Sequence, residues 1–235
     1  FKLRRIINNW KLYTCGNYFK SYKKEYILRE KILISTGGSG GHVIPALNFY
    51  EHLKNDYDIF LTTDLRGLRF INSDFCNKTI IDVPDIKKNI LKIPINLLYF
   101  FFSIIKSVIF LKKNKINKII STGGYMTLPI CIASKLIKSK LFLFEPNMVL
   151  GKSNSIFLNQ CKKIFCYSDE IKKFPKKYQN KIEIIYPLIK KENYNFDNVD
   201  KKSANSKIFL IIGGSQGANF FQTELIHTIK KLGKK

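Results

Sequence analysis

Three short stretches of the chain combine glycine with polar residues, immediately after apolar runs. They are Gly37-Gly38-Ser39-Gly40-Gly41, Gly123-Gly124 and Gly213-Gly214-Ser215-Gln216-Gly217. A turn from a strand into a helix exposes unpaired N–H groups, and glycine lets a phosphate approach them closely. A single such turn is equally well explained by tight packing. Three of them at strand ends favour a phosphate-bearing ligand.

Two titratable side chains stand beside these turns. His42 follows the first turn and precedes Pro45, which suits the first turn of a helix. A histidine there is a candidate general base or hydrogen-bond donor to a phosphate, although a capping or core role is the alternative. Glu145 follows the apolar run "LFLF". It is expected either to orient a sugar hydroxyl or to cap the next helix.

The glycine spacing excludes one familiar nucleotide motif and weakens another. No Lys-Ser or Lys-Thr follows the turns, so the P-loop pattern is absent. The dinucleotide pattern GxGxxG fails where Val43 takes the place of its last glycine. Asp64 follows the next apolar run, where a ribose-binding acid would stand, so that interpretation remains as a weaker alternative.

The elements that must position these residues alternate along the chain. Short apolar runs predict strands at 31–36, 57–63, 79–84, 117–122, 140–145, 162–168 and 181–187, and helical spacing predicts helices at 42–55, 126–138 and 153–161. This alternation predicts an α/β domain with a mostly parallel sheet over 31–189. The polar stretch 190–206 reads as a linker, and 207–235 as the first βα unit of a second, incomplete α/β domain.

The segment 93–111 breaks this pattern because its 19 residues carry one charge, Lys106. A buried core helix, a transmembrane helix and a helix lying on a membrane surface are the three interpretations. Lysines on both sides favour the third, since they suit anionic headgroups. The residues expected to associate with a membrane are Lys87, Lys88, Lys92, Leu97, Leu98, Phe101, Phe102, Ile105, Lys112 and Lys113.

Composition adds a strong charge but little specificity. The net charge is +24, from 41 Lys and Arg against 17 Asp and Glu, and such a surface attracts anions. Codon bias toward A+T is an equally good origin of these lysines. No nucleic-acid recognition motif is present, so nucleic acid is not an expected partner.

The five cysteines have no zinc or disulfide spacing, and we expect reduced thiols and no metal site. The basic stretch 1–30 lacks a signal-peptide pattern and reads as a membrane tether or, preferably, as translated upstream sequence.

Four motifs in order carry a resemblance to a known family. They are "GGSGGHVIP" at 37–45, "STGGYMTLP" at 121–129, "FEPNMVLGKSN" at 144–154 and "GGSQGA" at 213–218. The sequence resembles the MurG family of peptidoglycan N-acetylglucosaminyltransferases, in glycosyltransferase family 28, over about residues 31–235. The resemblance implies a GT-B architecture, with the N-terminal Rossmann-like domain present and the second only begun.

The resemblance also implies a reaction. It is the inverting transfer of N-acetylglucosamine from UDP-GlcNAc to undecaprenyl-diphosphate-MurNAc-pentapeptide (lipid I), which gives lipid II without a cofactor or an assigned metal. His42 would be the base, with Glu145 as rival or partner. The other positions implied to bind substrate are Ser39, Gly40, Gly41, Tyr125, Asn147, Ser215 and Gln216.

A cellular setting follows from the same resemblance. It is the cytoplasmic face of the bacterial inner membrane, where the protein would be peripheral. Besides the two substrates, the implied partners are anionic inner-membrane lipids and other proteins of cell-wall synthesis and division.

Some residues depart from the family pattern. The family's threonine in the first turn is Ser39, and two polar residues around Glu145 are replaced by Phe144 and Pro146. A donor-contacting arginine falls on Ile189. Because the family is longer than this chain, we expect a C-terminally truncated enzyme that is inactive alone. The alternative is a non-catalytic, membrane-docking acceptor subunit of a two-chain glycosyltransferase.

Overall fold

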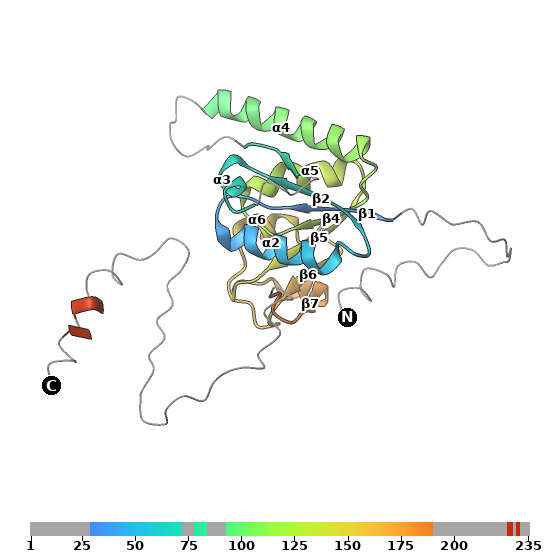
Figure 1. Cartoon of the computed structure of the whole chain (residues 1–235). Coiled ribbons are helices and arrows are strands. Elements are labelled where there is room, and N and C mark those ends of the chain that lie inside the picture. The colour runs from blue at the N-terminus through green and yellow to red at the C-terminus, as the bar shows by residue number, and fades with distance from the viewer. Residues whose placement is uncertain (1–28, 72–77, 84–92, 190–224, 228, 231–235) are drawn as a thin grey trace. The chain divides into compact units, whose positions relative to one another are not determined.

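The described part of the chain is built around a parallel sheet with helices on both sides (Figure 1). The structure is a computed structural model, and it describes residues 29–71, 78–83, 93–189, 225–227 and 229–230. The seven strands have the order β3-β2-β1-β4-β5-β6-β7, and every pairing is parallel. Their bounds are β1 Lys31–Ser35, β2 Asp58–Thr63, β3 Lys78–Ile80, β4 Lys118–Ser121, β5 Lys140–Glu145, β6 Lys163–Cys166 and β7 Ile182–Ile184.

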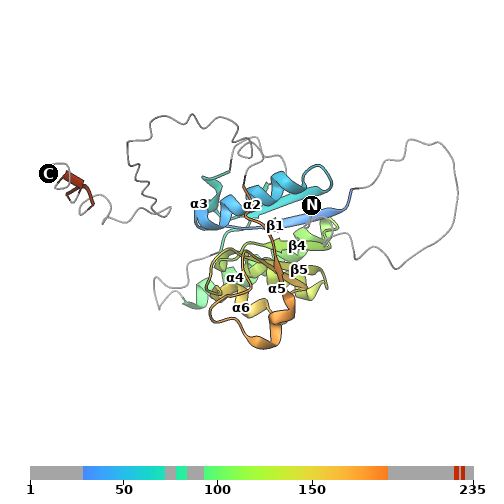
Figure 2. The same cartoon turned by 90° about the horizontal axis from the view of Figure 1, so that it is seen from below.

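Apolar residues on both faces of the strands explain why both faces are covered. In β1, Ile32 and Ile34 enter the core beneath α2 (Gly40–Leu53), and Leu33 enters the core on the opposite face. That second face is covered by α4 (Ile93–Lys113), α5 (Leu128–Leu136) and α6 (Lys152–Phe157), as Figure 2 shows. Near-continuous apolar strands are typical of parallel sheets buried on both sides.

The predicted α/β class with a parallel sheet is confirmed. Each predicted strand of the first domain is present, although β3 ends at Ile80 and is shorter than expected. The sequence did not predict α3 (Leu65–Leu68) or the 3₁₀ helices Tyr125–Thr127 and Lys176–Lys181.

The chain divides into two compact units, Phe1–Lys191 and Glu192–Lys235. In the second unit, the described residues 225–227 and 229–230 are helical. The predicted linker, and the predicted strand and glycine turn of the second domain, lie outside the described residues. So do residues 1–28 of the basic stretch 1–30, for which translated upstream sequence is the preferred interpretation and a membrane tether the alternative.

Helix α4 packs on α5 and leaves most of its apolar surface exposed. Its buried residues are Ser103, Ser107 and Leu111, spaced by four along one face. The hydroxyl of Ser103 donates to Asp82 O at 2.9 Å, and that of Ser107 donates to Ser103 O at 2.7 Å. The buried-core interpretation is therefore wrong. By length and composition α4 is the one helix among the described residues that is suitable for crossing a membrane.

Candidate functional site

The glycine turns meet where the chain order of the sheet reverses. β1 and β4 are neighbours, but β1 leads into α2 on one face while β4 leads into α5 on the other. Beyond the two strands, Thr122 N donates to Ser35 O at 3.0 Å, and the hydroxyls of Thr122 and Thr36 are 2.8 Å apart. In open α/β sheets, ligands bind at the carboxyl edge at such a reversal.

The first turn presents the amino end of α2 at this edge. Ser39 is the N-cap residue, and its side chain makes no capping hydrogen bond. Its carbonyl accepts from His42 N at 3.0 Å and from Val43 N at 3.2 Å. The N–H groups of Ser39, Gly40 and Gly41 belong to the first positions of the helix, where no intrahelical acceptor exists. These three amides are the predicted anion-binding group, and they are adjacent in space.

His42 reaches from α2 across to the second turn. Its Nδ1 lies 2.8 Å from Thr122 O, and because a carbonyl only accepts, Nδ1 carries the proton. Nε2 of the neutral ring therefore holds a lone pair. The hydrogen bond connects elements that follow β1 and β4, so it fixes the imidazole at the point of reversal.

The glycines of the second turn make room for this imidazole. Gly123 and Gly124 have φ of +85° and +83°, which side-chain-bearing residues rarely adopt. A Cβ at Gly124 would lie 3.3 Å from His42 Cδ2 and 3.4 Å from Nε2. One at Gly123 would lie 3.5 Å from His42 Cε1. The glycine pair is thus required both by its backbone and by the ring packed against it.

Glu145 is buried at the end of β5, with 2% of its surface exposed. Its Oε1 accepts from Asn147 Nδ2 at 2.9 Å and from Asn147 N at 3.3 Å. Its Oε2 accepts from Gly151 N at 2.8 Å and from Asn154 Nδ2 at 3.0 Å. Both oxygens are occupied by donors, so the geometry favours a carboxylate that holds the loop 146–151 in place. Of the two candidate bases, His42 has the lone pair available.

Asn154 is a site residue that the sequence analysis did not single out. It is buried on α6, and its amide donates to Phe144 O at 3.0 Å as well as to Glu145. It also packs against the second turn, because a Cβ at Gly123 would lie 3.3 Å from its Nδ2. The signal was its place at the end of the third motif. Asn154 therefore connects the Glu145 loop to the glycine turn under His42.

Asp64 and Arg66 connect the two glycine turns from the β2 side. Asp64 Oδ1 accepts from Gly38 N at 2.7 Å and Gly67 N at 2.9 Å, and Arg66 Nε donates to Oδ2 at 2.9 Å. Burial alone would raise the pKa of Asp64, but the N–H of Gly38, the Arg66 side chain and the N–H of Gly67 together lower it. With its oxygens so occupied, Asp64 is a structural carboxylate, and the ribose-binding alternative is wrong.

Tyr125 lies beside this pair. Arg66 Nη2 lies 3.2 Å from the Tyr125 hydroxyl, which donates in turn to Val83 O at 3.2 Å. The guanidinium also stands 5.4 Å from the centre of the Tyr125 ring. Tyr125 is thus held at the second turn by contacts that the sequence did not predict.

The structure gathers seven predicted site residues at one edge of the sheet. They are Ser39, Gly40, Gly41, His42, Tyr125, Glu145 and Asn147. Ser215, Gln216, Lys87, Lys88 and Lys92 lie outside the described residues. The predicted membrane-associating residues of α4 lie on a helix that packs on α5 and whose buried residues are Ser103, Ser107 and Leu111.

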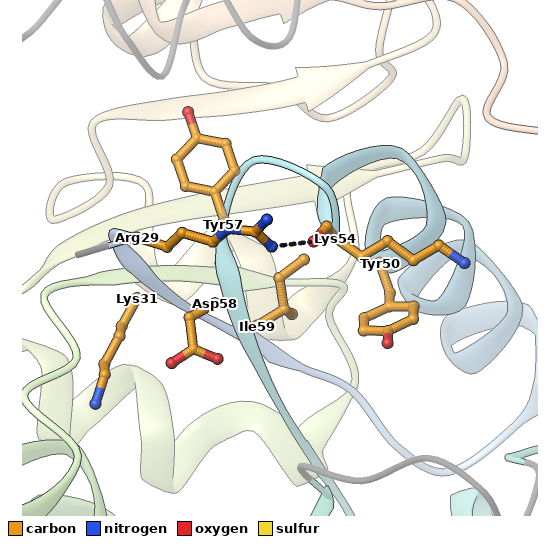
Figure 3. Close-up of a pocket in the computed structure, with 7 residues that line it drawn as sticks. All are labelled: Arg29, Lys31, Tyr50, Lys54, Tyr57, Asp58 and Ile59. Atoms are coloured by element: carbon orange, nitrogen blue, oxygen red, sulfur yellow. Dashed lines mark hydrogen bonds between the residues drawn. The ribbon is translucent and has the colours of Figure 1, made fainter. Parts of the chain in front are cut away.

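A hollow at the opposite edge of the sheet is not part of this site. Arg29, Lys31, Asp58 and neighbouring residues line it, at the amino ends of β1 and β2 (Figure 3). Lys31 and Tyr57 point in different directions there. The Lys31 ammonium lies 5.6 Å from the centre of the Phe60 ring.

Several known proteins are similar to this chain over the part that holds the candidate site. The family model for the glycosyltransferase family 28 N-terminal domain matches residues 32–166. This range contains both described glycine turns, His42 and Glu145.

Several curated relatives bear the name UDP-N-acetylglucosamine--N-acetylmuramyl-(pentapeptide) pyrophosphoryl-undecaprenol N-acetylglucosamine transferase. The protein from Pelagibacter ubique is 51% identical over 207 residues, and that from Rickettsia bellii is 32% identical over 215 residues. Each alignment covers 88% of this chain and 58% of the relative. The chain thus spans less than two thirds of the length of these relatives.

A solved structure with a similar fold is the crystal structure of Acinetobacter baumannii MurG. It has a TM-score of 0.58 at 19% identity, over 73% of this chain and 50% of that one. At this identity the likeness shows a shared fold.

Proposed function

This chain belongs to glycosyltransferase family 28, and we propose that it supplies the acceptor-binding part of an N-acetylglucosaminyltransferase. The substrates are UDP-GlcNAc and lipid I, and the product is lipid II. The names of the Pelagibacter and Rickettsia relatives support this choice of reaction. In this proposal residues 31–189 bind the acceptor, 190–206 form a linker and 207–235 begin the domain that binds the donor.

The observation that carries the proposal is the hydrogen bond from His42 Nδ1 to Thr122 O. It leaves Nε2 as a proton acceptor at the edge where ligands of such sheets bind. In the reaction, the C4 hydroxyl oxygen of the acceptor forms a bond to the anomeric carbon of N-acetylglucosamine. The bond from that carbon to UDP breaks, UDP leaves with the electron pair, and the hydroxyl proton passes to Nε2.

The amides of Ser39, Gly40 and Gly41 bind the diphosphate of lipid I in this scheme. The positive end of the α2 dipole adds to their attraction for an anion. Glu145 acts through Asn147 and Asn154 as a positioning residue, because its oxygens are already bonded to those side chains. Asn147, which is exposed, is the substrate-facing member of that group, together with Ser215 and Gln216 from the second domain.

Helix α4 brings the site to a lipid-linked substrate. Eight large apolar side chains of α4 are exposed: Ile95, Leu97, Leu98, Tyr99, Phe101, Phe102, Ile105 and Ile109. Lys112 and Lys113 are exposed in its last turn. An apolar helix face with cations at its end suits the interface of an anionic membrane. The proposed location is the cytoplasmic face of the inner membrane.

A lipid II synthesis assay with radiolabelled UDP-GlcNAc tests the reaction. It compares this chain, the chain joined to the remaining part of the Pelagibacter relative, and His42→Ala in the joined protein. We expect turnover by the joined protein, and a loss of about 10²- to 10⁴-fold in kcat for His42→Ala, the usual contribution of a general base. A joined protein that ignores lipid I and uses another acceptor refutes the substrate assignment.

A further inference from the structure

The first glycine turn has a feature that opposes anion binding. Asp64, 1% exposed, lies directly behind it and takes the Gly38 N–H for its own carboxylate. The lowered pKa of Asp64 keeps it charged at neutral pH. A buried negative charge beside a turn repels a diphosphate through the low-dielectric protein. A turn that binds a diphosphate therefore needs a compensating cation.

Arg66 is placed to be that cation. Its Nε forms the ion pair with Asp64 at 2.9 Å, while 52% of its side chain remains exposed. A guanidinium has five N–H donors in a planar fork, so it can donate to a carboxylate through Nε and still offer further N–H groups to a phosphate.

Arg66 also stands between the two turns. Through Asp64 it is connected to Gly38 of the first turn, and through Nη2 it contacts Tyr125 and Met126 Sδ, the latter at 3.1 Å, in the second. These contacts fix the guanidinium without consuming its exposed part. An anion that spans both turns would meet it.

We propose that Arg66 binds one phosphate of the acceptor's diphosphate, while the amides at the start of α2 bind the other. This assignment rests on the proposed function and adds a specificity-determining residue to it. A diphosphate engages both groups, whereas a monophosphate engages only one. Arg66 thus makes the site selective for a prenyl diphosphate over a prenyl monophosphate.

The test is calorimetric titration of this chain with two short-chain, water-soluble probes. One is a prenyl-diphosphate-MurNAc-pentapeptide and the other is the matching monophosphate. The variants are Arg66→Met, Arg66→Lys and, as the matched control, Arg69→Met. Arg69 lies three residues further on, is exposed, and stacks on Phe70 at 4.9 Å.

The readout is the ratio of the two dissociation constants. In Arg66→Met we expect diphosphate affinity to fall about 10- to 100-fold, as for loss of one charge-assisted hydrogen bond, with much less change for the monophosphate. Arg66→Lys keeps the charge but loses the planar fork, so its ratio of dissociation constants lies between those of the unmodified chain and of Arg66→Met. Arg69→Met keeps the ratio of the unmodified chain.

A merely structural role for Arg66 gives a different result. Because Arg66→Met also deprives Asp64 of its cation, thermal unfolding is measured alongside, and titrations are made where each variant is folded. If Arg66→Met weakens both probes equally, or neither, while the unmodified chain binds the diphosphate, the assignment to Arg66 is wrong. If the unmodified chain binds neither probe, the proposed function falls as well.

Discussion

Replacing Glu145 by Gln distinguishes a structural role of its carboxylate from a role as the catalytic base. Gln has nearly the same shape but offers an NH₂ group in place of one oxygen. The new NH₂ would face the exposed Asn147, so the bond from Asn147 N would be lost and the Asn147 side-chain amide would have to turn its Oδ1 toward the NH₂. The bonds from Gly151 and Asn154 would then reach a neutral oxygen in place of a charged one.

The size of the effect follows from these contacts. Hydrogen bonds to charged groups contribute about 1.5–3 kcal/mol each, and the bond from Asn147 N at 3.3 Å is long and weak. We therefore expect Glu145→Gln to lower the free energy of unfolding by about 2–4 kcal/mol. For a domain of this size that corresponds to a fall in Tm of roughly 5–15 °C.

Thermal and urea unfolding of this chain measure the change, with Glu183→Gln as the control. Glu183 is a partly exposed residue of β7, 3.7 Å from Lys163, and its loss is expected to cost less than about 1 kcal/mol. An unchanged Tm for Glu145→Gln would refute the structural role. It would return Glu145 to the position of candidate base.

Three further predictions concern other parts of the molecule. Gly124→Ala should lower the free energy of unfolding by about 1–3 kcal/mol, because Gly124 has φ 83° and ψ 152° and the new methyl group would press on the His42 ring. Thermal or urea unfolding measures the loss of stability, and the NMR signals of the imidazole report the displacement of the ring. Asp64→Asn should lower the free energy of unfolding at pH 7, and by progressively less as the pH falls. A carboxyl whose pKa is lowered in the folded state stabilises the fold above its unfolded pKa of about 4, and this stabilisation is lost as the pH falls through the folded pKa. A difference in unfolding free energy between variant and unmodified chain that stays constant from about pH 7 to about pH 3 would contradict this. Replacing the exposed Leu98 and Phe101 by Ser should reduce flotation with anionic liposomes while leaving Tm within about 2 °C, since neither side chain is in the core; equal flotation would count against α4 as the membrane contact.

Periodicity was enough to predict the sheet, because buried parallel strands are continuous apolar runs. The runs around Leu33, Ile119 and Leu141 became central strands. It missed α3, since four residues are too few to show a helical period. It favoured a membrane-surface helix for the segment of α4 without excluding a buried core helix, because only the packed structure reveals that Ser103, Ser107 and Leu111 are the residues of α4 that are buried.

The candidate site was predictable as residue types but not as contacts. Glycine turns at strand ends indicated the edge of the sheet, and His42 was identified beside it. The tautomer of His42 depends on Thr122 O, which is 80 residues away in the chain. The hydrogen bonds that Glu145 accepts from Gly151 and Asn154 depend on how the loop between Glu145 and Asn154 folds back. Such pairings are set by tertiary packing, and sequence spacing carries no signal for them.

The central claim is that backbone amides at the reversal point of the sheet bind the diphosphate of the acceptor beside His42. An NMR titration of this ¹⁵N-labelled chain with the short-chain lipid I analogue tests it most directly. The account predicts that the largest shifts occur at the amides of Ser39, Gly40 and Gly41, with a shift of the His42 Nε2 resonance at the same ligand concentrations. Shifts confined to the hollow near Arg29 and Asp58, or no shifts at saturating analogue, would contradict it.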